Sequence, residues 1–333
     1  MKRHQSPLWL DEKEQIRLMS MDTIQEMLQN VHIQFGGDYL LVLPFYQLFG
    51  ENKWGLAVPH MISTFLSFYL LYLVCRSFYK SIWGYVVCFI VFSFNKTMIF
   101  HALEIRPYSV LIMLSLSGFL LIKHIFGHNV HSLPKIILIN VGLFLTMAFH
   151  LFGTPILFFS YLFQISCHFL DQNHYKVIID HLKKYIWSVL AGLCVIFYFV
   201  IRFSHERGGD WKHDPFQFVE NGVVPILKMI FGNATGQKTL YPLLIGLPIA
   251  FLIPDKQQIK RILFFILLFI LPVGCVYALC VTKHKWFIQR LFVWTMPWFA
   301  ILLGWCWDTI AVFFKRLIAS KRNQPPLSPS KQF

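Results

Sequence analysis

Long apolar stretches dominate this chain, and they constrain its fold more than any other feature of the sequence. A transmembrane helix needs roughly 20 apolar residues, or about 17 at the short end, and several stretches reach or approach that length. We therefore predict about nine transmembrane spans. Their expected positions are 55–75, 82–99, 107–122, 136–150, 152–170, 186–201, 240–253, 262–281 and 291–314.

These stretches favour helices over strands. Lipid offers no partner to the backbone groups of an open sheet edge, and the stretches lack the alternating pattern of barrel strands. The composition agrees, since 56% of the residues are hydrophobic and only 14% are charged, which is more apolar than a soluble domain. The sequence predicts an all-α integral membrane protein.

The net charge of +14 does not indicate nucleic-acid binding. The basic residues are scattered among the loops between apolar stretches and form no single soluble face, so we expect no nucleic-acid partner. The seven cysteines lie within or at the ends of apolar stretches and lack metal-ligand spacing. We interpret them as small helix-packing residues and predict no metal site from them.

Basic residues are densest in the short loops that begin at Arg76, Lys123, Asp171 and Asp255 and in the tail after Phe314. Short basic loops face the cytoplasm. This divides the chain into an outer segment 1–53, a polytopic transmembrane part 54–314, and a basic, proline-containing cytoplasmic tail 315–333. The turn around Glu104 then lies on the outer face, together with the N-terminal segment.

The N-terminal segment has no apolar stretch behind Lys2 and Arg3, so we predict no cleavable signal. A polar segment of this length is difficult to translocate ahead of the first span, and we expect a missing first helix, through truncation or a misassigned start codon. The stretches 21–27, 39–49 and 223–231 suit interfacial helices in the outer loops.

Two motifs carry carboxylates to the outer face. The first is Leu-Trp-Leu-Asp-Glu at 8–12, and the second is Glu-Ile-Arg-Pro-Tyr at 104–108, at the head of a span. Between them lie an interfacial helix, His32 and a short apolar helix ending in Phe-Gly. In this order the motifs resemble the GT-C glycosyltransferases, in the branch of protein O-mannosyltransferases, lipid A aminoarabinose transferases and rhizobial galacturonosyltransferases. The resemblance is strongest over residues 7–165.

The resemblance implies transfer of a sugar from a polyprenyl-phosphate carrier to an acceptor hydroxyl or amine of a glycan, lipid or protein. The reaction would occur on the periplasmic, exterior or luminal side of the membrane. No cofactor is implied with certainty, and the need for a divalent metal stays open. A departing phosphate gains negative charge while the sugar gains oxocarbenium character, so cations should face the phosphate and a carboxylate should serve the acceptor.

Residue roles follow from the same resemblance. Asp11 matches the family's catalytic aspartate and would act as general base in an inverting displacement, with Glu12 orienting it or raising its basicity. The alternative is a solvated Asp-Glu pair near a terminus. Arg106 would clamp the donor phosphate beside Glu104, although the two could instead stabilise a tight turn. Tyr108 is equally a candidate sugar ligand or interfacial anchor.

Three further residues are candidates for binding the donor. His32 aligns with the family's His-Pro-Pro motif, but Ile33 and Gln34 replace the prolines. His150 lies at the outer end of the fourth predicted span and could bind phosphate, or only form a hydrogen bond. Arg290 precedes the last span and is a second candidate phosphate clamp, or an ordinary flanking residue of a helix end.

The main alternative function is a polytopic transporter or lipid flippase, since helices around a central cavity would serve either task. A transporter should show internal repeats, or charges and broken helices near the bilayer midplane. We find no convincing repeat. A non-catalytic relative acting in an assembly is a third interpretation, against which the outer-loop carboxylates argue.

Overall fold

The structure is a computed structural model of all 333 residues. It describes residues 10–30, 36–95, 99, 104–127, 132–150, 153–172, 179–180, 183–205, 238–255, 257–275 and 293–322. Within these ranges the chain is helical and contains no strand. The predicted all-α fold class is therefore confirmed for the described residues.

The helices fall into three groups along the chain. Three short helices form the N-terminal segment, apolar helices of 5 to 23 residues follow, and a helix of 27 residues closes the described part of the chain. Their bounds are α1 (Leu10–Met19), α2 (Ile24–Asn30), α3 (Gly37–Phe49), α4 (Lys53–Cys75), α5 (Ile82–Ser93), α7 (Tyr108–Gly127), α8 (Leu133–Phe149), α9 (Gly153–Gln172), α11 (Ile186–His205), η4 (Lys238–Ile245), α13 (Gly246–Leu252), α14 (Gln258–Phe265), η5 (Ile266–Ile270) and α16 (Met296–Arg322).

Five described helical segments are long and apolar enough to cross a membrane, and they indicate a membrane protein. Three further apolar helices are shorter. Among these, α5 has 12 residues, or about 18 Å of helix against a hydrocarbon core of about 30 Å. The predicted count of nine spans therefore stays a prediction. The five long segments are Lys53–Cys75, Tyr108–Phe126, Gly153–Asp171, Gln258–Cys275 and Val293–Ala319.

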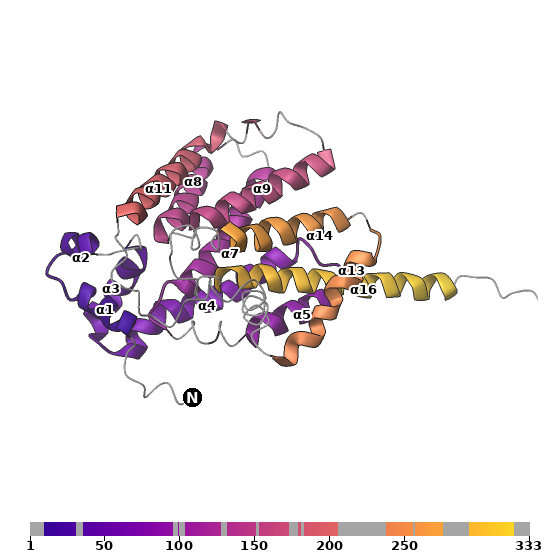
Figure 1. Ribbon diagram of the computed structural model, residues 1–333, viewed down its shortest axis with the longest axis horizontal. Coiled ribbons are helices and arrows are strands. Elements are labelled where there is room, and N and C mark those ends of the chain that lie inside the picture. Colours follow the sequence, from indigo (N-terminus) through magenta and orange to yellow (C-terminus); the bar gives the residue numbers. More distant parts are fainter. Residues whose placement is uncertain are drawn as a thin grey trace, which may run out of the picture.

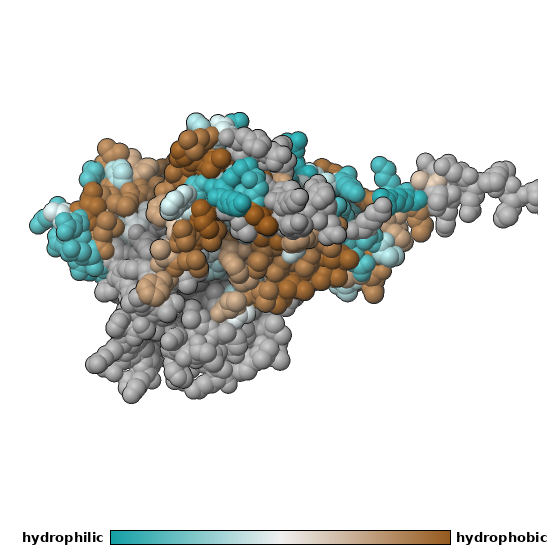
Figure 2. Space-filling model, turned by 90° about the horizontal axis from the view of Figure 1, so that it is seen from above, coloured by the Kyte–Doolittle hydropathy of each residue, from teal (hydrophilic) through white to brown (hydrophobic). Residues whose placement is uncertain are grey.

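Large apolar side chains on these helices point away from the protein core. Phe65 on α4, Leu138 on α8 and Trp187 on α11 are each more than 70% exposed. Figure 2 shows apolar side chains over much of the viewed face, interrupted by a hydrophilic group near the middle and by hydrophilic side chains toward both ends. Water would penalise apolar patches of this extent, whereas lipid tails accommodate them.

The core forms around α16, which runs along the long axis of the molecule (Figure 1). Trp294, Trp298 and Phe299 are almost fully buried there, among side chains from α5, α7, α9 and α14. Asp308 fixes the register of α16 against α5, because its carboxylate accepts hydrogen bonds from the backbone N–H groups of Lys80 and Ser81. The predicted last span continues as helix to Arg322, into the basic tail.

Helices α1, α2 and α3 gather at one end of the molecule, and the C-terminal part of α16 extends from the opposite end (Figure 1). The predicted helix at 21–27 is instead α2 at Ile24–Asn30, after a bend that follows α1. The predicted stretch at 39–49 is helical, as α3, while its interfacial placement stays a prediction; α3 starts after Gly36, whose φ of 71° suits glycine. A small core beneath these helices includes Ile16, Val42 and Leu56.

Candidate functional site

The two carboxylate motifs meet in the structure, although more than 90 residues separate them. Glu12 on α1 is 1% exposed, and its Oε1 accepts a hydrogen bond from the backbone N–H of Ile105 at 3.3 Å. Its Oε2 lies 3.5 Å from Nζ of Lys53. The Ile105 side chain is fully buried in the small core with Ile16 and Leu18. Polar and apolar contacts therefore both hold the 104–108 segment against α1.

Asp11 is the second residue of α1 and directly precedes Glu12. Its backbone is thereby placed beside the 104–108 segment, while its side chain lies outside the described part of the structure. Both acidic residues occupy the first turn of α1, where the backbone N–H groups of a helix favour negative charge.

Arg106, Tyr108 and His150 form the second half of the site. Tyr108 is the first residue of α7, and His150 directly follows α8. Their ring centroids lie 6.5 Å apart, and both side chains are buried. The charge of Arg106 acts on His150, so the guanidinium is near that ring. Glu104 and Arg106 are partly exposed and accessible from outside.

The structure thus brings most of the predicted site residues to the end of the molecule formed by α1 and the start of α7. Glu12 is hydrogen-bonded to the backbone of the 104–108 segment, which carries Arg106 and Tyr108, and Tyr108 is in ring contact with His150. His32 and Arg290 lie outside the described residues, and their roles stay predictions.

A buried polar chain beside this site was missed by sequence reasoning. Gln15 Nε2 on α1 donates a hydrogen bond to Asp38 Oδ2 on α3 at 2.8 Å. Asp38 Oδ1 lies 3.8 Å from His60 Nε2 on α4, and His60 Nδ1 lies 3.4 Å from the Ser109 hydroxyl on α7. Asp38 and His60 are 1% and 0% exposed. Four helices therefore contribute to a single polar chain.

The electrostatic state of Asp38 follows from its burial. Loss of water disfavours the carboxylate and raises the pKa of Asp38 from 3.8 to about 7, while the hydrogen bond from Gln15 acts in the opposite direction. Asp38 in turn contributes to raising the pKa of its neighbour Tyr39 to about 12, an effect dominated by burial of the phenol. Asp38 therefore changes its charge close to neutral pH.

Two signals in the sequence could have revealed this buried series of polar side chains. His60 is an ionisable residue inside a predicted span, and such residues are functional candidates in membrane proteins. Asp38 introduces a carboxylate at the head of an apolar stretch, directly after two glycines. Their proximity was not accessible from sequence, because it depends on how α3 packs against α4.

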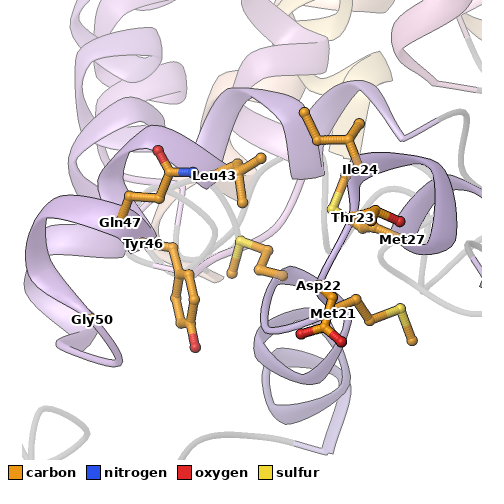
Figure 3. Close-up of a pocket in the computed structure, with 10 residues that line it drawn as sticks. Met21, Asp22, Thr23, Ile24, Met27, Leu43, Tyr46, Gln47 and Gly50 are labelled. Carbon is orange, nitrogen blue, oxygen red and sulfur yellow. The ribbon is translucent and has the colours of Figure 1, made fainter.

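A pocket of about 340 Å³ opens beside the site, between the α1–α2 bend and α3. In Figure 3, Leu43, Tyr46 and Gln47 lie on the α3 side, and Met21, Asp22, Thr23, Ile24 and Met27 lie on the other. Met19 also lines the pocket and is seven residues along α1 from Glu12, about 10 Å at helical rise. A methionine-rich wall adapts readily to flexible apolar groups.

The described side chains of the site do not form a set of metal ligands. In the part of the chain that the structure describes, no group of three or more His, Cys, Asp or Glu side chains lies close enough together to hold a metal ion.

Comparison of the chain with family models, with curated proteins and with solved structures finds no match.

Proposed function

We propose that this chain is a membrane glycosyltransferase that moves a sugar from a polyprenyl-phosphate carrier to an acceptor hydroxyl or amine on the non-cytoplasmic face. The observation that carries the proposal is the contact between Glu12 and the backbone of Ile105. It brings the start of α1, which carries Asp11 and Glu12, against the partly exposed turn that carries Arg106. Phosphate displacement from a sugar requires a base and a cation, and these segments supply both residue types.

In the proposed reaction, Asp11 takes the proton from the acceptor as the acceptor atom bonds to the anomeric carbon. The bond between that carbon and the phosphate oxygen breaks on the opposite side, and its electron pair leaves with the polyprenyl phosphate. Arg106 neutralises the departing phosphate, with Arg290 as a second cation. Glu12, paired with Lys53 and the backbone of Ile105, fixes the start of α1 and thereby positions Asp11.

The arrangement of the molecule suits a lipid-linked donor. The site lies at the end formed by α1–α3, and the basic residues of late α16 lie toward the other end, as expected if those residues face the cytoplasm. The proposal includes nine spans, of which five are long enough in the described residues. It places α2 and α3 in the interface, where the methionine-lined pocket would receive apolar parts of a substrate.

The direct test is turnover by the purified full-length protein in detergent and in proteoliposomes. A panel of radiolabelled polyprenyl-phosphate sugars is incubated with membrane glycans, lipids and proteins as acceptors. We expect labelled product and release of polyprenyl phosphate with at least one donor. Absence of turnover with every donor and acceptor would contradict the proposal.

A transporter or lipid flippase is the second candidate function, and the Asp38–His60 pair favours it. The pair is fully buried, His60 lies within an apolar helix, and such groups occur in proton relays of transporters. The same proteoliposomes discriminate the two functions. Solute or lipid flux without sugar transfer, abolished by Asp38→Asn, would identify a transporter.

A further inference from the structure

The Asp38–His60 pair has a geometry that ordinary core packing does not explain. Asp38 Oδ1 and His60 Nε2 face each other at 3.8 Å, and both are buried atoms without a hydrogen-bond partner. Their other polar atoms have hydrogen-bond partners, since Asp38 Oδ2 accepts from Gln15 and His60 Nδ1 pairs with the Ser109 hydroxyl. A buried polar atom without a partner costs about 1–3 kcal/mol, so a proton held between these two facing atoms would relieve the cost of both.

The pair connects the two halves of the candidate site. Gln15 lies on α1, one turn beyond Glu12, and ties that helix to Asp38. Ser109 lies on α7, three residues after Arg106, and contacts His60. The carboxylates of α1 and the arginine turn before α7 are thus joined through the interior by a polar chain, in addition to their contact at Ile105.

We infer that Asp38 is a positioning residue which, together with His60, holds one proton and thereby sets the placement of α1 against α7. This inference rests on the proposed transferase function, since it assigns the pair to positioning Asp11 against Arg106. Asp38 and His60 act through these neighbours and do not themselves contact substrate in the proposed reaction.

The proton sets the direction of the hydrogen bonds in the chain. With the proton on Asp38, Oδ1 faces His60 Nε2 as the donor, at a separation of 3.8 Å that a small approach of the two side chains would close to a hydrogen bond, and Nδ1–H donates to the Ser109 hydroxyl. After the proton is lost, His60 Nε2–H donates to the carboxylate, and the Ser109 hydroxyl donates to Nδ1. The first state leaves no charge in the interior, whereas the second holds an anion among apolar helices. The protonated pair is therefore the state that holds α1 and α7 together.

Among the residues that the structure describes, the charged groups around Asp38 do not supply a cation that would favour the anion. On α1, Glu12 is paired with Lys53, and Glu14 with Arg17. On α3, Tyr39 is itself affected by the Asp38 charge. His60 is the facing group on α4, Tyr108 stands at the start of α7, and His150, in ring contact with Tyr108, follows α8. The burial of Asp38 is consequently the dominant influence on its proton.

Infrared titration of the full-length protein tests the shared proton without any substrate. The wild type should show a protonated-carboxyl band that disappears on raising the pH from 5 to 9, with a midpoint near the pKa of about 7. Asp38→Asn should lack the band. A wild-type spectrum without this titrating band would overturn the inference.

Hydrogen exchange of α1 tests the positioning role. After correction for intrinsic rates, the wild type should lose protection of α1 between pH 6 and pH 8.5, while Asp38→Asn, which stays neutral, should not. Glu14→Gln is the matched control on α1, because its partly exposed side chain pairs with Arg17 of the same helix and not with the polar chain, and it should behave as wild type. Equal loss of protection in wild type and Asp38→Asn would overturn the inference.

The transferase assay adds a functional readout. Wild-type kcat/KM should fall about tenfold per pH unit above the titration of the pair, as expected for loss of one essential proton, and Asp38→Asn should keep a flat profile in that range. An alkaline fall that persists in Asp38→Asn would overturn the inference while leaving transferase activity in place. A wild type without turnover would instead contradict the proposed function, and the infrared and exchange results would still decide on the pair.

Discussion

The charge state of Asp38 should make the stability of the protein depend on pH in a way that Asp38→Asn removes. The folded pKa of about 7 lies above the ordinary value of 3.8 for an aspartate in water. The folded state therefore binds more protons than the unfolded state between these values, and stability falls as the pH rises through this window. Above pH 7 the buried carboxylate costs about 4 kcal/mol. At pH 5 the cost is less than half of that.

The assay is thermal unfolding of the detergent-solubilised wild type and Asp38→Asn at pH 5 and pH 8. Asparagine keeps an oxygen for Gln15, so the packing is largely conserved. Relative to wild type, the variant should gain about 3 kcal/mol between the two pH values, or roughly 4 °C in Tm for a chain of this length. A difference in Tm between the two proteins that is independent of pH would refute the assignment of a buried, titrating Asp38.

Other predictions concern packing and the donor site. Asp308→Ala leaves two backbone N–H groups before α5 without their acceptor and should lower the free energy of unfolding by about 2–4 kcal/mol, measured by denaturant titration. Gly153→Ala places a Cβ against the carbonyl oxygen of Thr146 and should lower Tm by several degrees, whereas Gly274→Ala, which meets no atom within 4 Å, should leave Tm unchanged or raise it. Arg106→Lys loses bidentate phosphate contact and should lower kcat/KM for the lipid donor about tenfold or more; an unchanged value would contradict the clamp.

The helical class of this fold was predictable because hydrophobic length and the absence of alternation are local properties of the sequence. The positions of α3 and of the long apolar helices followed from the same pattern. The ends of helices were harder to predict from the sequence. The start of α2 is an example, because the bend after α1 depends on packing of Met27 against the core under α3. The continuation of α16 into the tail shows that basic residues do not end a helix.

The candidate site could be predicted from the sequence where a motif places its residues next to each other. Glu104, Arg106 and Tyr108 form one such motif, and the structure places it against Glu12. The polar chain through Asp38 and His60 was not accessible, because its members come from four helices and each looks isolated in its own segment. Long-range pairing of this kind depends on tertiary packing and not on local propensity.

The central claim is tested most directly by the single-turnover rate of Asp11→Asn with a lipid-linked sugar donor. The matched control is Glu26→Gln, which makes the same carboxylate-to-amide change on the exposed face of α2. We expect Asp11→Asn to lose about 10²–10⁴-fold in rate, the usual contribution of a general base, and Glu26→Gln to retain the wild-type rate. Sugar transfer by Asp11→Asn at the wild-type rate would contradict the account.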